Sequence, residues 1–180
     1  MKKYILILLL LTGSLTVNAQ EKMKLANSEV SFFSSAPMED IAAMNKATSG
    51  IIDFETKKFV MAVPIKDFEF DKSLMQEHFN ENYMESDKYP KGVLKGSFTG
   101  DVDLGKDGEY KLEAMGELDI HGKTMERTIP VTLTVKDGKA TIYSEFTVKL
   151  EDHKIKIPKV VFMNIAEEIE VKIKSELVEI

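Results

Sequence analysis

Residues 110–150 read YKLEAMGELDIHGKTMERTIPVTLTVKDGKATIYSEFTVKL, and apolar and polar side chains alternate along most of this stretch. A period of two places apolar residues on one face of a β-strand and polar residues on the other. The rows at 110–120, 129–135 and 140–150 therefore predict three consecutive strands. Asp137-Gly138, between the last two rows, has the composition of a two-residue hairpin turn, so these two strands are expected to be antiparallel.

The same alternation continues on both sides of this stretch. Further rows occur at 30–32, 50–54, 59–65, 94–102 and 169–177. The phase of the pattern changes between Ile65 and Phe68, and Pro64 favours a bulge or a sheet edge there. About eight strands is the number that closes into a barrel around a filled or ligand-sized interior. The predicted fold class is all-β, an antiparallel β-barrel of about eight strands with one or two short helices.

Two segments carry a helical pattern instead. In the longer one, Ser73 and Gln76 are spaced as a capping box. Five of its residues fall on one helical stripe, namely Leu74, Met75, His78, Phe79 and Tyr83. A second, shorter helix is expected to begin at Ser35, with Pro37 in its first turn and apolar residues at helical spacing, namely Met38, Ile41 and Met44. The longer helix lies between strands, so we expect it to cover one end of the barrel.

The first twenty residues have the order of a cleavable signal peptide. A basic start precedes an apolar run over 4–11 and a small polar stretch that ends at Ala19. This run is shorter than the roughly 20 apolar residues of a transmembrane helix, which disfavours a retained membrane anchor. Because the chain has no cysteine, lipid attachment at a lipobox is excluded. The prediction is a signal peptide at 1–19 and one domain at 20–180, periplasmic or secreted.

Composition and motifs exclude several classes of function. The net charge of −6 without basic clusters argues against nucleic acid as a partner, and no later apolar segment reaches membrane length. No phosphate-binding loop, dinucleotide-binding glycine turn or nucleophile elbow occurs. His78, His121 and His153 lack metal-ligand spacing, although two of them could still meet in the fold. No catalytic residue, metal ligand or cofactor is assigned, the protein is not expected to be an enzyme, and its oligomeric state is left open.

The predicted interior contains many small side chains. These are Gly50, Gly96, Gly100, Ala114, Gly116, Ala140, Ser144 and Ser175. Small inward residues leave volume for a ligand, but they also mark strand bends or make room for a helix. The pattern therefore leaves a ligand cavity and a filled core as alternatives.

Two motifs resemble the YceI-like protein family. Residues 74–90, LMQEHFNENYMESDKYP, followed by Gly96 and Phe98, look like the helix-to-strand segment of that family, and GELDIHGKT at 116–124 resembles its strand ending in a Gly-x-Thr turn. The similarity extends from about Val30 to the C-terminus. The resemblance implies an exported, lipocalin-like antiparallel barrel, and characterised members of the family bind a polyisoprenoid chain in the barrel.

The function predicted on these grounds is that of an exported lipid-binding protein, which holds a long apolar, polyisoprenoid-like chain for carriage, storage or a stress response. The candidate barrel-lining residues are Ile52, Phe54, Phe59, Met61, Phe98, Leu112, Ala114, Leu118, Phe146 and Val171. The alternative is a non-enzymatic stress or interaction protein with a solid barrel core and no ligand, which predicts an interior packed to normal density. A hydrolase or isomerase would need converging polar groups inside, and the inward rows supply almost none.

Overall fold

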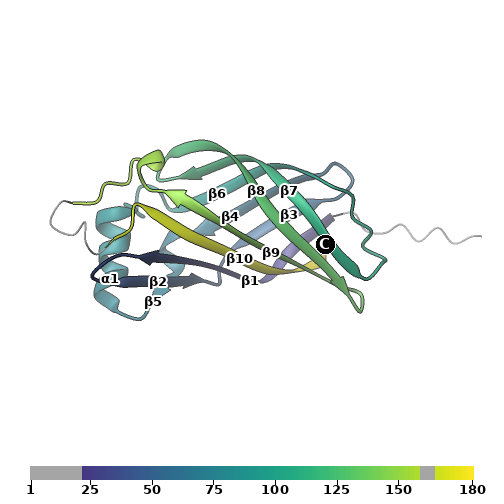
Figure 1. The fold of residues 1–180 in the computed structure, drawn as a ribbon, viewed down its shortest axis with the longest axis horizontal. Coiled ribbons are helices and arrows are strands. Elements are labelled where there is room, and N and C mark those ends of the chain that lie inside the picture. Colours follow the sequence, from purple (N-terminus) through teal and green to yellow (C-terminus); the bar gives the residue numbers. More distant parts are fainter. Residues whose placement is uncertain (1–21, 159–164) are drawn as a thin grey trace, which may run out of the picture.

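The computed structural model describes residues 22–158 and 165–180, so the signal peptide expected at 1–19 lies outside the described residues. Within them, eight strands form a closed antiparallel barrel (Figure 1). Around the barrel the strands follow the order β1 (Lys22–Ser35), β3 (Ser49–Asp53), β4 (Lys58–Pro64), β6 (Lys91–Thr99), β7 (Gly108–Ile120), β8 (Lys123–Lys136), β9 (Lys139–Lys149) and β10 (Glu168–Glu179). Pairing between β10 and β1 closes the barrel. The predicted fold class is confirmed.

The two faces of the strands follow the alternation in the sequence. On β7, Leu112 and Leu118 are buried, whereas Lys111 and Glu113, the two neighbours of Leu112 in the sequence, are exposed. Across the β9–β10 pair, inward residues meet inward residues, for example Phe146 opposite Val171. Because a one-residue slip would expose a whole apolar row, this register is strongly determined by burial.

The hairpin between β8 and β9 is formed by Asp137 and Gly138, as predicted. Lys136 pairs with Lys139 across the turn, and the two central residues have φ angles of 51° and 72°. Positive φ at both central positions belongs to a type I′ turn, whose twist matches that of the flanking strands. Aspartate and glycine tolerate this conformation better than most residues do.

The phase change predicted after Pro64 is also present. The strand β4 ends at Pro64, and the 3₁₀ turn η1 (Ile65–Asp67) leads into the short strand β5 (Phe68–Phe70). This turn lets Ile65 and Phe68 both be buried although they lie on opposite phases of the sequence pattern. The strand β5 then pairs with β2 (Asp40–Asn45).

The helix expected to begin at Ser35 is wrong, because the segment after β1 turns back and forms strand β2. Residues of β2 pair with β1 from Val30 to Ser35. Asn45 is fully buried at the end of β2, where its Nδ2 donates to the carbonyl oxygen of Pro64 at 2.7 Å and its Oδ1 accepts from the Thr48 hydroxyl at 3.1 Å. The backbone hydrogen bonds between β1 and β2 and the buried Asn45 amide stabilise a strand here. They contribute more than three apolar residues at helical spacing can contribute to a short helix.

The longer helix is present, with a different start. The helix α1 (Ser73–His78) continues into the π-helical turn η2 (Phe79–Tyr83) at one end of the barrel (Figure 1). The predicted capping box does not form, because Lys72 occupies the N-cap position without a side-chain hydrogen bond. Instead, the Lys72 carbonyl accepts from the backbone N–H groups of Met75 and Gln76 at 3.0 and 3.2 Å. In the part of the chain that the structure describes, no helix is long and apolar enough to cross a membrane.

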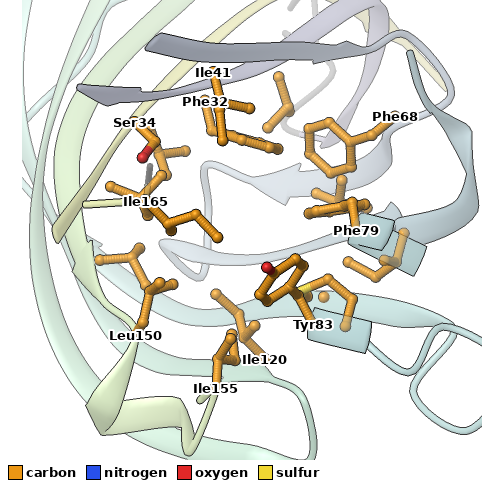
Figure 2. Close-up of a pocket in the computed structure, with 18 of the residues that line it drawn as sticks. Phe32, Ser34, Ile41, Phe68, Phe79, Tyr83, Ile120, Leu150, Ile155 and Ile165 are labelled. Carbon is orange, nitrogen blue, oxygen red and sulfur yellow. The ribbon is translucent and has the colours of Figure 1, made fainter. Parts of the chain in front are cut away.

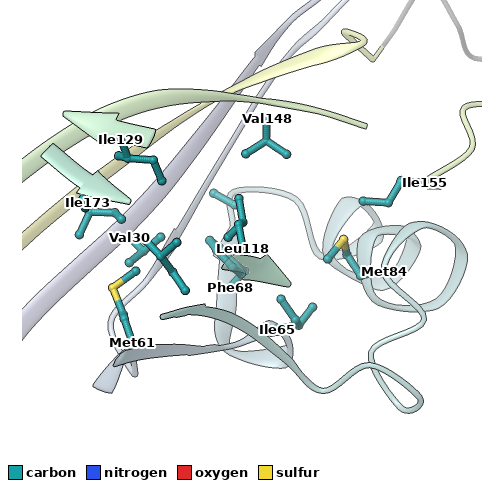
Figure 3. Close-up of a cluster of buried hydrophobic side chains, with 13 residues drawn as sticks. Val30, Met61, Ile65, Phe68, Met84, Leu118, Ile129, Val148, Ile155 and Ile173 are labelled. Atoms are coloured by element: carbon teal, nitrogen blue, oxygen red, sulfur yellow. The ribbon is translucent and has the colours of Figure 1, made fainter. Parts of the chain in front are cut away.

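Two clusters of buried apolar side chains fill the barrel. One lies toward α1 and contains Val30, Met61, Leu118, Ile129 and Ile173 among its members (Figure 3). The other lies toward the β8–β9 hairpin, and its buried members include Phe98, Leu112, Leu133, Val135 and Leu177. The first cluster also borders a cavity of about 340 Å³.

Candidate apolar binding site

A cavity of about 340 Å³ occupies the end of the barrel beneath α1 and η2 (Figure 2). Its walls come from inward residues of the barrel strands, including Val30, Val63, Leu118, Phe146 and Val171. Met75 and Phe79 line it from the helical side, as do Tyr83 and Met84. The volume lies in the range of small-molecule sites, about 300–1,000 Å³, and the lining is predominantly apolar, which is typical of such sites.

The helical segment over this cavity, formed by α1 and η2, is called the cover. Four phenylalanine rings fix its position. The Phe79 ring of η2 stacks on Phe32 of β1 with centroids 5.4 Å apart, and it meets Phe68 and Phe70 of β5 at 5.6 and 5.1 Å. Aromatic pairs at these distances contribute roughly 0.5–1.5 kcal/mol each beyond the area they bury. The position of the cover therefore depends on β5, which precedes α1 directly, and on β1, which is far from it in the sequence.

A hydrogen-bonded histidine pair holds the other side of the cover. Nε2 of His121 lies 2.9 Å from Oε2 of Glu85, which follows η2, and Nδ1 of His121 lies 3.2 Å from the carbonyl oxygen of His153. His153 is fully buried in the turn η3 (Glu151–His153), and its Nδ1 lies 3.0 Å from the Lys123 carbonyl oxygen. Two of the three histidines thus meet in the fold, in a structural arrangement. No cluster of three or more metal-ligating side chains occurs among residues 22–158 and 165–180.

Few polar atoms face the larger cavity. The Ser34 hydroxyl accepts a hydrogen bond from the Ala166 backbone N–H at 2.9 Å. The Tyr83 hydroxyl points into the cavity (Figure 2), and burial raises the pKa of this phenol. Tyr83 is therefore a neutral hydroxyl at the edge of a predominantly apolar space, and it can hydrogen-bond to a polar end of a bound molecule. Glu39 and His78 also border this space.

A smaller cavity of about 80 Å³ lies farther along the barrel, toward the β8–β9 hairpin. Aromatic and aliphatic side chains line it, among them Phe54, Phe59, Phe98, Leu112 and Ala114. Met61, Leu94 and Ile173 border both cavities. The interior of the barrel is thus one apolar column that is divided unequally by these three side chains.

All ten residues predicted to line the barrel face its interior. Met61, Leu118, Phe146 and Val171 line the larger cavity. The smaller one is lined by Met61 again, together with Ile52, Phe54, Phe59, Phe98, Leu112 and Ala114. That these residues contact a ligand stays a prediction.

The prediction missed most of the residues that cover the larger cavity. These include Phe68, Phe79, Tyr83, Met84, Ile155 and Ile165. Four residues of the predicted helical stripe, Met75, His78, Phe79 and Tyr83, line the larger cavity. The fifth, Leu74, is 59% exposed and does not face the barrel, so this part of the prediction is wrong. No sequence pattern indicated that Ile155 and Ile165, which lie in irregular segments, would join them.

Gly96 of β6 and Gly116 of β7 do not open the interior, so the explanation that small inward residues leave volume for a ligand does not hold for these two. Gly96 and Gly116 are register partners, and neither borders a cavity. A Cβ atom on Gly96 would lie 2.1 Å from the Met115 carbonyl oxygen, and one on Gly116 would lie 2.1 Å from that of Lys95. Both residues must be glycine because the two backbones approach so closely. Of the small residues, Ala114 and Ser144 do border the smaller cavity.

Comparison with known proteins places this barrel in a family. Residues 12–177 match the family model of the YceI-like domain. The structure of BcnA from Burkholderia cenocepacia is similar, with a TM-score of 0.69 and 18% identity over 83% of this chain and 95% of that one. A polyisoprenoid binding domain from Saccharophagus degradans, implicated in plant cell wall breakdown, has a TM-score of 0.74 and 12% identity over 90% and 100%. The Campylobacter jejuni YCEI protein has a TM-score of 0.59 and 19% identity over 73% and 81%. No curated protein matches in sequence.

Proposed function

The chain belongs to the YceI-like domain family, and from this membership we propose that it is a binding protein that holds one long apolar molecule of the polyisoprenoid type inside its barrel. The observation that carries the proposal is the apolar cavity of about 340 Å³ beneath α1 and η2. A structural neighbour from Saccharophagus degradans is described as a polyisoprenoid binding domain, which supports the same class of ligand.

The driving force for binding would be the burial of apolar surface, about 25 cal/mol per Å² removed from water. A flexible chain loses conformational freedom when it binds, so only the surplus over this cost appears as affinity. The alternative of a solid barrel predicts an interior packed to normal density, whereas the larger cavity is roughly ten times the volume of one water molecule, about 30 Å³. This comparison favours ligand binding.

Support for a binding role over an enzymatic one comes from the family and from the character of the cavity. The polar side chains that border it are those of Ser34, Glu39, His78 and Tyr83. The Ser34 hydroxyl already accepts a backbone hydrogen bond, and the Glu39 carboxylate pairs with Lys72 at 2.7 Å. An acyl-transfer or hydrolytic site needs a nucleophile, a base and oxyanion donors in mutual contact. The lining instead offers shape and apolar surface, which select a ligand by its dimensions.

The direct test is mass spectrometry of lipids extracted from protein purified out of its native host. We expect one class of long apolar molecule to copurify with the wild-type protein. Val171→Phe, which places a ring in the larger cavity, should remove this molecule, whereas Thr147→Phe on the outer face of β9 should retain it. An extract without any apolar molecule, or the same yield from Val171→Phe, would contradict the proposal.

We also propose that the protein acts outside the cytoplasm, after cleavage behind Ala19. The support is the order of basic, apolar and small residues in the first twenty positions. N-terminal sequencing of protein from the native host should find Gln20 first. Recovery of a chain that still begins with Met1, in the cytoplasmic fraction, would overturn this proposal without affecting the one on ligand binding.

A further inference from the structure

Three buried side chains separate the two cavities of the barrel. Met61, Leu94 and Ile173 border both of them, and each is no more than 9% exposed. All three belong to the same packed cluster, in which Met61 and Ile173 lie next to Val30 (Figure 3). We call these three residues the floor of the larger cavity.

The floor spans the barrel from wall to wall. In the order of the eight strands, β6 lies four places from β10, so Leu94 and Ile173 come from opposite walls. Met61, on the neighbouring strand β4, is the register partner of Leu94. Methionine is unbranched and adapts its shape easily, whereas leucine and isoleucine are stiffer. Met61 is therefore the member of the floor that most readily moves or is replaced.

The cavity volume limits the length of chain that fits above the floor. A cavity of about 150 Å³ takes up benzene, which corresponds to roughly 25 Å³ per carbon atom. On this scale the larger cavity of about 340 Å³ accommodates about 14 carbons. The smaller cavity of about 80 Å³ would add only about three carbons, and only if the floor opened.

From this geometry we propose that the floor residues set the chain length of the ligand, so that the protein selects a chain of about three isoprene units over longer ones. The inference rests on the proposed function and adds its specificity. A longer chain would have to displace Met61, or leave its surplus carbons outside the apolar cavity and in contact with water. Either outcome costs affinity for each additional unit.

The test is competition among geraniol, farnesol and geranylgeraniol, which contain two, three and four isoprene units, measured by native mass spectrometry on the full mature chain. The wild-type protein should bind farnesol best, by roughly tenfold over geranylgeraniol. Met61→Ala joins the two cavities and should bring geranylgeraniol to at least the affinity of farnesol. Met115→Ala is the matched control, because Met115 is exposed on β7 and borders neither cavity.

A second substitution makes the interpretation specific. Ala114 borders only the smaller cavity, so Ala114→Leu fills that cavity without touching the larger one. In the Met61→Ala background it should restore the preference for farnesol. Should Met61→Ala not fold, Ile173→Ala opens the same floor from the opposite wall and is expected to have the same effect.

The outcomes separate this inference from the proposed function. If none of the three alcohols binds the wild-type protein, the proposed function fails. Equal binding of farnesol and geranylgeraniol by the wild-type protein, or a preference that Met61→Ala leaves unchanged, overturns the role of the floor and leaves the proposed function standing.

Discussion

The two ends of the barrel use the same alternating pattern, yet side chains fill one end and leave the other partly empty. Toward the β8–β9 hairpin, residues such as Leu112 and Leu133 pack closely and leave a cavity of only about 80 Å³. Toward α1 the cavity measures about 340 Å³. The difference arises from what closes each end. Side chains from facing strands meet at the first, whereas a helix with its own side chains stands across the second.

This comparison shows that alternation determines which residues face inward and not how closely they meet. Gly96 and Gly116 let β6 and β7 approach until no Cβ atom would fit between them. At the helical end, β2 and β5 continue the sheet beyond β1, and η2 lies against β1 and β5 through Phe79. The packing of that cover, rather than the barrel pattern, sets the size of the larger cavity.

The largest effect is expected from a matched pair of leucines, one at each end. Leu133 is 1% exposed in the tightly packed end, and its replacement by Ala should lower the free energy of unfolding by about 2–5 kcal/mol. Leu150 borders the larger cavity and is only partly buried, so its replacement should cost only about 1–2 kcal/mol, because less of its side chain is removed from water. Urea denaturation of both variants measures the difference. Equal losses would show that the two ends are packed alike.

The close approach of β6 and β7 gives the next effect. Gly116→Ala should lower the unfolding free energy by about 1–3 kcal/mol, because the new Cβ would meet the Lys95 carbonyl oxygen. Gly105→Ala is the control, since the nearest atom to its Cβ would be at 3.4 Å, on the Asp103 side chain. A small loss at both positions in thermal or urea unfolding would mean that the backbones do not touch here.

At the helical end, the aromatic contacts of Phe79 are expected to contribute an intermediate amount. Phe79→Leu removes three ring contacts and should cost about 1–2 kcal/mol of stability. It should also speed the release of a bound apolar probe, because the cover is held less firmly. Leu74→Ala on the exposed face of α1 should change neither quantity, since Leu74 is 59% exposed. Stopped-flow release of a fluorescent fatty acid measures the rate. An unchanged rate in Phe79→Leu would show that the cover does not control ligand release.

The smallest effect is expected from the contact between Glu85 and His121. Glu85→Gln weakens a partly exposed pair and should cost at most about 1 kcal/mol. Its effect should be local, as faster amide hydrogen exchange over residues 73–85. Glu117→Gln, which weakens the exposed pair with Lys95 on the barrel wall, is the matched control and should leave that segment unchanged. Identical exchange in both variants would show that His121 does not hold the cover.

Much of the barrel was predictable because its signals are local. The alternating rows from Tyr110 onward and the Asp137-Gly138 turn each depend on neighbouring residues only. The segment from Ser35 was mispredicted because three apolar residues at helical spacing say nothing about the strand that pairs with them. In the structure, Ala43 and Asn45 face inward, and pairing with β1 decides the conformation.

The candidate site likewise contains residues that a local sequence pattern indicated and residues that no pattern indicated. The ten barrel-lining residues were identified from the phase of the rows, while Ile155 and Ile165 lie in irregular segments that carry no periodic signal. The role of the glycines was ambiguous, because a missing side chain has the same sequence signal whether it leaves space or admits a neighbouring backbone.

By itself the sequence determined most of the barrel strands, their inward faces and the presence of the helix that covers one end, because each follows from the spacing of apolar residues over a few positions. Only the tertiary structure decided where the interior stays empty. A cavity is the difference between the volume that the backbone encloses and the volume that side chains from opposite walls occupy. Met61, Leu94 and Ile173 are far apart in the chain, yet all three border both cavities of the barrel.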